Sequence, residues 1–527
     1  MTDCPTTKDE IRRAAAEVMG VDAGTVDDDA NLIGLGMDSI RMMRLAGGWR
    51  RAGAAVTFRE LAEDPTVTRW HALLTGGRPV VAEPVVSAGP VDATAPFDLT
   101  PVQRAYWIGR QEGMALGGVG CHAYLELDGT DIEPDRLERA VRRVLERHEM
   151  LRARFTDEGR QLIQDKSPWP GLTVHDLTDT EAEALRSRLS HRVLDVAAGE
   201  VFDVQLSRLP EGRTRVHVNI DLLVADVASI ELVLTDLARA YRDPEELPAA
   251  PAYGFAQYLQ DYRAWCGDPG TPGSPAAVAR DFWRAKLPEL PSPGPKLPLA
   301  VPPTTVTAPR FSRRTVEIDP TTWDRITQRA REHAVTPATV LATAYAEVLG
   351  AWSEEPRFLL NVPLFDRQPL DPAVGELVAD FTNLVLLAVD LTEPLPFADR
   401  ARTVQSQLQQ NASHAQYSTL NVLQDLRRAH RDRRAGAPVV FACNLNSAFV
   451  PDVAREELGE WTWMLSQTPQ VWLDHQVYKV DGALVLAWDA VDELFPEGLL
   501  TEMLTAYDTL LRGLVEPTAW QTTPVIR

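Results

Sequence analysis

A proline- and glycine-rich interruption at residues 78–95 constrains the fold of this chain more than any other feature of its sequence. The stretch reads RPVVAEPVVSAGPVDATA, which has no helical period and no face that a fold could bury. At 527 residues, the chain is also too long for one ordinary core. We therefore expect a linker at 78–95 between a small unit, residues 1–77, and a larger region that begins at residue 96.

The unit before the linker reads as a small helical bundle. Four segments carry apolar residues at helical spacing, and the first two are separated by a long loop through DDDANLIGLGMD. These segments are residues 7–19, 39–53, 57–64 and 66–76.

The region after the linker alternates strand-like and helix-like segments, which predicts an α/β fold. Strands are expected at residues 215–225, 357–365, 384–391 and 437–445, with helices at 135–151 and 337–352. A second proline-rich break, LPELPSPGPKLPLAVPP, divides the region. We expect an N-terminal lobe at 96–290 and a C-terminal lobe at 291–527.

Charge and cysteine usage exclude several classes of protein. The chain has 53 Lys and Arg residues against 75 Asp and Glu residues, a net charge of −22, which disfavours binding to nucleic acid and to anionic membrane surfaces. Its four cysteines are scattered without metal-ligand spacing, so we expect no disulfide framework and no metal site. No signal-like segment and no run of about 20 apolar residues is present. A cytoplasmic protein without a membrane span is expected.

Within the helical unit, Gly34 and Gly36 form a tight loop before Asp38 and Ser39, which open a helix. Asp and Ser at this place are also ordinary helix caps, so the pair alone is a weak signal. In its setting the sequence GMDSI resembles the acyl and peptidyl carrier proteins, whose serine bears 4'-phosphopantetheine. A helix start suits a phosphodiester because unpaired backbone N–H groups lie there. The surrounding residues are most similar to aryl carrier domains, which hold salicylate or dihydroxybenzoate as a thioester.

The motifs after the linker resemble the condensation superfamily of nonribosomal peptide synthetases. They are FDLTPVQRAYWIGR (97–110), RHEMLRARF (147–155) and SQTPQVWLDHQV (466–477). Condensation domains carry HHxxxDG at a strand-to-helix turn, whereas the heterocyclization subclass carries DxxxxD, and this chain has Asp221 and Asp226 there. The resemblance implies two chloramphenicol-acetyltransferase-like lobes in a V shape, with the active site in a tunnel between them.

The two aspartates have a structural interpretation and a catalytic one. Asp226 precedes an amphipathic stripe and is suited to cap that helix. Asp221 interrupts an apolar strand, so it needs a basic or N–H partner to offset its burial. We favour bracing of the turn over proton transfer. Two hard ligands alone do not make a divalent metal site, and the family implies none.

Asp474 is the predicted acid/base. Strand alternation places Trp472, Asp474 and Gln476 on one face, where partial burial favours the protonated carboxyl. A solvated edge-strand carboxylate fits the spacing equally well, and the resemblance decides for catalysis. Asn361 is a second candidate, since its amide could orient substrate.

One position departs from the family pattern. Where heterocyclization domains usually have Thr-Ser, this chain has Ala442 and Cys443. This puts efficient ring closure in doubt unless Cys443 or Asn444 substitutes, or Asp474 acts through water.

Together these features predict an aryl carrier followed by a heterocyclization domain, an enzyme of siderophore-type biosynthesis. It would condense the aryl thioester with carrier-bound Cys, Ser or Thr and cyclodehydrate the amide to a thiazoline or oxazoline. The expected partners are a phosphopantetheinyl transferase, an aryl-acid adenylating ligase acting in trans, and downstream adenylation and peptidyl carrier domains. Alternatives are a condensation domain that stops at the amide and a noncatalytic domain that docks carriers.

Overall fold

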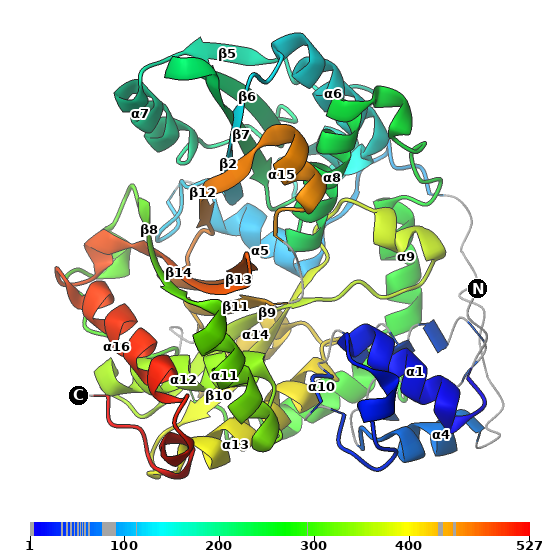
Figure 1. Cartoon of the computed structure of the whole chain (residues 1–527), viewed down its shortest axis with the longest axis vertical. Coiled ribbons are helices and arrows are strands. Elements are labelled where there is room, and N and C mark those ends of the chain that lie inside the picture. Colours follow the sequence, from blue (N-terminus) through cyan, green and yellow to red (C-terminus); the bar gives the residue numbers. More distant parts are fainter. Residues whose placement is uncertain are drawn as a thin grey trace.

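The computed structural model arranges the chain as a small helical unit beside two larger lobes, each built on its own sheet (Figure 1). It describes residues 5–32, 35–37, 41–42, 45–46, 48–49, 52, 54, 56, 60–61, 64–75, 91–111, 113–291, 293–430, 436–445 and 449–526. Most of the predicted linker and the predicted attachment residue Ser39 lie outside this set.

The helical unit begins with α1 (Lys8–Met19), which is fixed by a capping box. The Thr7 hydroxyl accepts the N–H of Glu10, and the Glu10 carboxylate accepts the N–H of Thr7 at 3.0 Å. A 3₁₀ turn follows at Ala23–Thr25, and α4 (Val67–Thr75) packs against α1. The two indoles Trp49 and Trp70 meet edge to face at 5.5 Å in the core of this unit.

The N-terminal lobe is built on a five-stranded sheet in the order β12-β2-β7-β6-β5. The strands are β2 (His122–Thr130), β5 (Thr173–Asp176), β6 (Phe202–Arg208), β7 (Arg213–Asp221) and β12 (Glu460–Gln467). Helices α6 (Pro134–Arg147), α8 (Val227–Arg242) and α15 (Asp452–Leu458) pack together on it, and α7 (Asp179–Leu189) lies apart from them (Figure 1). A small sheet joins β1 (Phe97–Asp98), β4 (Arg160–Ile163) and β3 (Ala153–Phe155).

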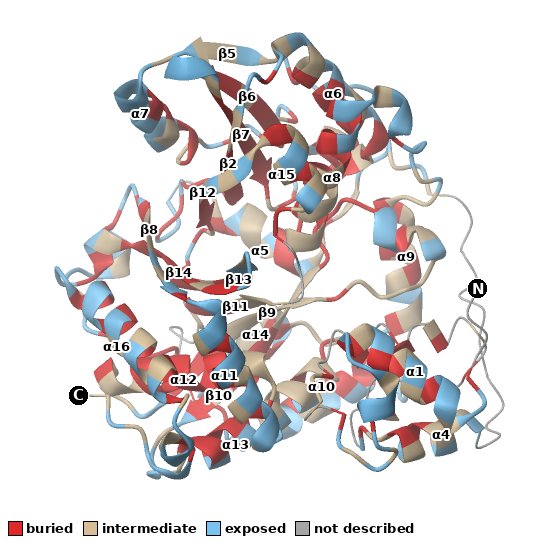
Figure 2. Ribbon diagram, in the orientation of Figure 1, coloured by how far each residue is buried: buried red, intermediate tan, exposed pale blue. Residues whose placement is uncertain are grey.

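The C-terminal lobe has a six-stranded sheet in the order β10-β9-β11-β13-β14-β8. Its strands are β8 (Phe311–Ile318), β9 (Arg357–Phe365), β10 (Thr382–Asp390), β11 (Val439–Asn444), β13 (Leu473–Val480) and β14 (Ala483–Val491). One face packs against α11 (Pro320–Glu332), α12 (Pro337–Trp352), α13 (Phe397–Ala412) and α16 (Leu499–Gly513). Helix α12 is buried along nearly its whole length, as Figure 2 shows.

The opposite face of this sheet looks toward the N-terminal lobe. At its β9–β10 edge this face is covered by α10 (Pro275–Lys286) and α14 (Thr419–His430). Two further helices, α5 (Pro101–Gly109) and α9 (Phe255–Cys266), lie in the part of the molecule where the lobes meet (Figure 1).

Strand β12 was not expected to cross between the lobes. The sequence places it in the region 291–527, yet it pairs antiparallel with β2 of the N-terminal lobe. Gly459, at φ +112°, makes the crossing possible, because an added Cβ would lie 2.3 Å from the carbonyl oxygen of Asp128. A division of the chain at residue 290 therefore does not account for β12, which follows that residue in sequence but belongs to the N-terminal sheet. The boundary between the lobes stays a prediction.

A second crossing segment joins the lobes at the start of α8. The backbone carbonyl of Ala379 accepts the Asp226 N–H at 3.1 Å and the Ser229 hydroxyl at 2.7 Å. The apolar side chains of Leu377, Val378 and Phe381 join the core of the N-terminal lobe. The chain that leads into β10 is thus anchored on the turn that carries the two predicted aspartates.

No single helix of the described residues is long and apolar enough to cross a membrane. Helices α11 and α12 pass that test only together, and they meet at an angle of 98°.

Candidate functional site

The turn between β7 and α8 is held by Asp221 and Asp226, both of which are buried. The Asp221 carboxylate accepts Arg110 Nη1 at 3.0 Å and the Leu223 N–H at 3.0 Å. Burial raises the pKa of Asp221, and the charge of Arg110 opposes that rise. The predicted basic and N–H partners of Asp221 are therefore confirmed.

Asp226 caps α8, as the sequence predicts, and also reaches the other lobe. Its Oδ1 accepts the Ser229 N–H at 2.8 Å and Arg367 Nη2 at 2.7 Å, and its Oδ2 accepts Arg367 Nε at 3.3 Å. Arg367 in turn donates to the carbonyl of Leu377 at 2.8 Å. All four oxygens of the two carboxylates are thus engaged in holding the turn, which favours bracing over proton transfer.

The residues suited to chemistry lie in one row across the C-terminal sheet. Strand register sets Asn361, Val440, Asp474, Asp489 and Arg313 side by side on β9, β11, β13, β14 and β8. Residues in register point to the same face, and adjacent strands are about 4.8 Å apart. Asn361 and Asp474 therefore share a face at roughly 10 Å, two strand spacings.

This face is the one opposite α11, α12, α13 and α16. The neighbouring β13 residues Leu473 and Val477 pack into the helix-side core, and His475 lies against Tyr507 of α16. The predicted alternation is confirmed for Asp474 and Gln476, which lie on the other face. It is wrong for Trp472, which precedes β13 and packs against the helix-side core.

Asp474 is buried, with 6% of its surface exposed. Its Oδ2 accepts Gln476 Nε2 at 3.0 Å, whereas its Oδ1 is buried and has no hydrogen-bond partner in the part of the chain that the structure describes. Burial, reinforced by the charge of Asp489, raises the pKa of Asp474 to about 7, while Gln476 and Arg313 act in the opposite direction. A carboxyl with this pKa can give and take a proton near neutral pH.

The neighbours of Asp474 form a fixed polar network that sequence reasoning missed. Arg313 donates two bonds to Asp489, at 2.7 and 2.5 Å, and one to Gln476 Oε1 at 3.1 Å. Asp489 also accepts the N–H of Ser466 on β12 at 3.0 Å, so the network reaches the other sheet. The charge of Asp489 inside the otherwise apolar strand β14 was a signal in the sequence, whereas Arg313 lies in the polar strand β8, which gave none.

The remaining predicted residues divide between the two faces. Asn361 has a buried Oδ1 without a partner among the described residues, on the same face as Asp474. Ala442 stands in register with Gln476, next to Asp474. Cys443 lies on the opposite face, where it packs against the helix-side core. The structure therefore does not bring Cys443 to Asp474, because successive strand residues face opposite ways.

Asp380 is a second buried carboxyl that the sequence gave no reason to single out. Its Oδ1 accepts the Thr382 N–H at 3.0 Å, and its Oδ2 is buried without a partner in the described chain. Burial raises the pKa of Asp380 to about 8. Burial also raises the pKa of Tyr106 on α5, and the charges of Asp380, Cys121 and Asp474 add to that rise.

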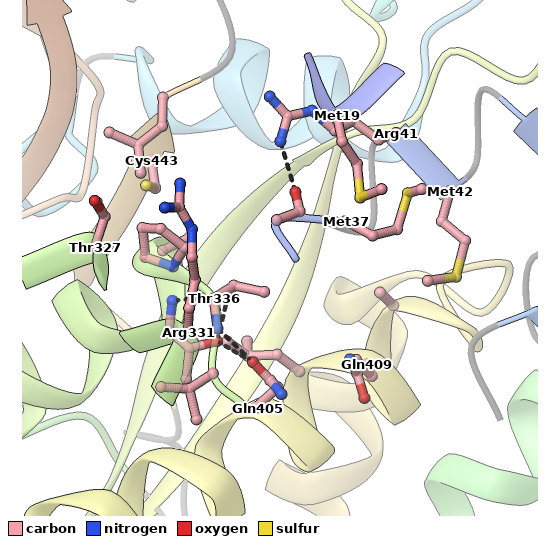
Figure 3. A pocket seen from close by; sticks show the side chains of 18 of the residues that line it. Met19, Met37, Arg41, Met42, Thr327, Arg331, Thr336, Gln405, Gln409 and Cys443 are labelled. Carbon is pink, nitrogen blue, oxygen red and sulfur yellow. Dashed lines mark hydrogen bonds between the residues drawn. The ribbon is translucent and has the colours of Figure 1, made fainter. Parts of the chain in front are cut away.

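A cavity of about 380 Å³ lies between the helical unit and the C-terminal lobe (Figure 3). The helical unit lines it with Met37 and Arg41, which flank Ser39 in sequence, and the lobe with Arg331, Gln405 and Cys443. Arg41 donates to the carbonyl of Gly36 at 2.6 Å. Guanidinium groups suit a phosphodiester and thioether side chains suit an alkyl stem, so the described surroundings fit a phosphopantetheine arm.

No group of three or more His, Cys, Asp or Glu side chains that could hold a metal ion occurs within the described residues.

Comparison with known proteins agrees with this architecture. Residues 95–520 match the family model of the condensation domain, and residues 9–74 match that of the phosphopantetheine attachment site. The chain belongs to the condensation domain family. A phosphopantetheine attachment region precedes its condensation domain, which confirms the predicted cofactor.

Solved structures of nonribosomal peptide synthetases share this architecture. The cyclization-docking bidomain of the EpoB nonribosomal peptide synthetase from Sorangium cellulosum is 35% identical, with a TM-score of 0.74 over 82% of this chain and 87% of that one. The synthetase FmoA3 is 31% identical, with a TM-score of 0.71 over 83% of this chain and 45% of that one. The predicted fold class, a helical carrier with a two-lobed α/β domain, is confirmed.

Two curated relatives match along nearly the whole chain. Pyochelin synthetase PchE of Pseudomonas aeruginosa is 42% identical over 98% of this chain and 36% of its own length. Phenyloxazoline synthase MbtB of Mycolicibacterium paratuberculosis is 42% identical over 99% of this chain and 45% of its own length. The chain thus spans less than half the length of these relatives.

Proposed function

We propose that this chain holds an aryl acyl group as a thioester on an arm at Ser39 and joins it to Cys, Ser or Thr on a partner carrier. It then closes the amide to a thiazoline or oxazoline. The observation that carries the proposal is Asp474, a buried carboxyl that titrates near neutrality and has one open oxygen on the face toward the other lobe. The names of the relatives agree, since a phenyloxazoline is such a ring bearing an aryl group.

The first stage, amide formation, needs alignment more than acid–base assistance. When bound, the arm supplies a thioester, which is already activated toward amines. The amine attacks the carbonyl carbon, the C–N bond forms, the C–S bond breaks and the thiol leaves. Holding both reactants in place supplies effective concentration. The contribution of Asp226 is to hold the two lobes in one arrangement through Arg367, while Asp221 fixes the turn within the N-terminal lobe through Arg110.

The second stage, ring closure, needs a proton donor. The thiol or hydroxyl of the amino acid adds to the amide carbonyl, and the resulting tetrahedral carbon must lose its hydroxyl as water. Protonated Asp474 gives its proton to that hydroxyl as the C–O bond breaks. The Asp474 carboxylate then takes the proton of the ring nitrogen, which forms the C=N bond and restores the acid.

Asn361 is suited to orient the amide for this step. Its open Oδ1 can accept the amide N–H or the attacking hydroxyl, and it lies on the same face as Asp474. Ala442 offers no hydroxyl beside Asp474. This supports a second candidate function, a domain that forms the amide and closes the ring slowly or not at all.

The family implies a phosphopantetheinyl transferase and neighbouring synthetase domains as partners. We further propose an aryl-acid adenylating ligase that acts in trans, and downstream adenylation and peptidyl carrier domains that present the amino acid. A cytoplasmic setting fits Cys121 and Cys266, which form no disulfide among the described residues.

Reconstitution tests the proposal. The protein is modified by a phosphopantetheinyl transferase, loaded with salicylate or dihydroxybenzoate, and mixed with carriers bearing Cys, Ser or Thr. Intact-protein mass should show one arm, absent in Ser39→Ala, and the product should be one water lighter than the linear amide. Linear amide alone would support the second candidate, and no amide with any of the three amino acids would refute both.

A further inference from the structure

Asp380 has a carboxylate oxygen without a hydrogen-bond partner among the described residues, and the proposed reaction steps do not use it. Its side chain is 1% exposed, and its Oδ1 is occupied by the Thr382 N–H. The buried Oδ2 has no partner in the described chain. A buried polar atom left unpaired costs free energy, so its retention suggests a ligand that supplies the missing donor.

Asp380 lines a pocket of about 350 Å³ to which both lobes contribute. Val102 of α5 and Tyr262 of α9 form one wall, and Tyr417 and Ser418, next to α14, form another. Its lining includes the aromatic side chains of Phe255, Tyr258, Tyr262, Phe381 and Tyr417.

The second carboxylate of this pocket, Asp366, is fully supplied with donors. Its Oδ2 accepts the Tyr262 hydroxyl at 3.0 Å and Asn383 Nδ2 at 3.1 Å, and its Oδ1 accepts Gln368 Nε2 at 2.5 Å. The contrast singles out Asp380 as the acceptor that this pocket presents to a ligand.

The other charged groups around Asp380 are already paired. Asp226 holds Arg367 across the seam between the lobes, and Arg263 at the pocket wall meets Asp98 at 3.1 Å. Among the charged side chains of the described chain that line the pocket, Asp380 is the one that keeps an oxygen without a hydrogen-bond partner.

We propose that Asp380 binds the α-ammonium group of the incoming carrier-bound amino acid and takes its proton before amide formation. The amino acid reaches Asp380 through the pocket that contains Tyr262 and Tyr417. This inference rests on the proposed function, because it assumes that the second substrate is an amine.

The proton balance is favourable at this carboxyl. A carboxyl of this pKa is mostly protonated at pH 7, so binding of the ammonium first displaces the proton of Asp380 to solvent. One proton then moves from the ammonium nitrogen to Asp380 Oδ2, which leaves a neutral amine whose lone pair attacks the thioester. Burial brings the pKa of Asp380 to about 8, close to the usual range of about 7.7–8.0 for an α-amino group. Transfer between such matched groups is nearly free of cost, whereas an aspartate of ordinary pKa would keep the amine protonated. The proton is released to solvent after the thiol has left.

Binding is the first test. Two stable arm analogues are compared, seryl-pantetheine with the thioester sulfur replaced by nitrogen and the same compound without the α-amine. The wild-type protein should bind the amine form about tenfold or more tightly at pH 7. Asp380→Asn should remove this preference. Glu347→Gln, which alters a buried carboxylate beside Arg400 outside the pocket, should keep it. Equal binding of both analogues by the wild-type protein would overturn the proposal whether or not the variants fold.

Kinetics is the second test. In single-turnover assays Asp380→Asn should form the amide about 10²-fold more slowly than wild type at pH 7. The deficit should shrink above pH 9, where the amine is already neutral, and a purely structural defect would not respond in this way. A wild-type rate at pH 7 would overturn the proposal. If the wild-type protein forms no amide at all, the proposed function fails, while the binding comparison still decides the role of Asp380.

Discussion

Replacing Gln476 with Met should move the pH range of ring closure without touching amide formation. Gln476 Nε2 donates to Asp474 Oδ2 at 3.0 Å, and this bond lowers the pKa of Asp474 because it stabilises the ionised carboxylate. Methionine has a similar length and flexibility but donates no hydrogen bond. The substitution removes this bond and the Arg313 bond to Gln476 Oε1, while Arg313 keeps its two bonds to Asp489 and the Asp474 carboxyl stays in place.

The size of the shift follows from the energy of that bond. A hydrogen bond to a charged group contributes about 1.5–3 kcal/mol, and one pKa unit corresponds to about 1.36 kcal/mol. The protonated carboxyl of Asp474 can still accept a hydrogen bond from Gln476, so the lower end of this energy range applies. Loss of the bond should therefore raise the pKa of Asp474 by about one unit. From about 7 in the wild-type protein, the pKa of Asp474 should reach roughly 8. Because the acid is protonated below its pKa, ring closure should persist to a higher pH.

The assay follows single turnovers between pH 5.5 and 9.5 and separates linear amide from heterocycle by mass. The falling limb of the ring-closure rate should lie about one pH unit higher in Gln476→Met, with amide formation unchanged. Gln467→Met is the matched control, since Gln467 is buried on β12 and donates to the carbonyl of Ser190. A limb that stays in place or moves to lower pH would refute Asp474 as the proton donor.

Three further predictions concern the contact between the lobes at Asp226, the backbone at Gly459 and the side chain at Ala442. Asp226→Ala leaves the Arg367 guanidinium without its carboxylate, so the free energy of unfolding should fall by about 3–5 kcal/mol and both stages should slow together; an unchanged urea midpoint with only ring closure lost would make Asp226 catalytic. Gly459→Ala forces a Cβ against the backbone of Asp128 and should cost about 1–3 kcal/mol or more in urea denaturation, whereas Gly375→Ala, which meets open space, should be neutral. Ala442→Thr adds a hydroxyl in register with Gln476 and should speed ring closure in the mass assay while leaving amide formation alone; an unchanged rate would show that Asp474 works without that hydroxyl.

Local features of the site could be predicted from the sequence because they depend on short-range periodicity. The alternation at residues 472–477 put Asp474 on the face away from the helices, and the stripe after Asp226 predicted its role as a cap. The need of Asp221 for a basic or N–H partner followed from the cost of burial alone.

Long-range features could not be predicted in this way. Arg110 is separated from Asp221 by 111 residues and Arg367 from Asp226 by 141, so no local pattern could identify either partner. The same holds for β12, whose pairing with β2 depends on a close backbone approach at Gly459. The open oxygen of Asp380 is a property of packing, since its neighbour Asp366 has the same side chain and is fully bonded.

The most direct test of this account is the product formed by Asp474→Asn. The amide side chain keeps the shape of the carboxyl but cannot exchange a proton near neutral pH, so the two stages should separate. The account predicts that the linear aryl-cysteinyl, -seryl or -threonyl thioester accumulates at the wild-type rate, one water heavier than the heterocycle, while ring closure falls about 10²- to 10⁴-fold. Formation of the heterocycle at the wild-type rate would contradict it.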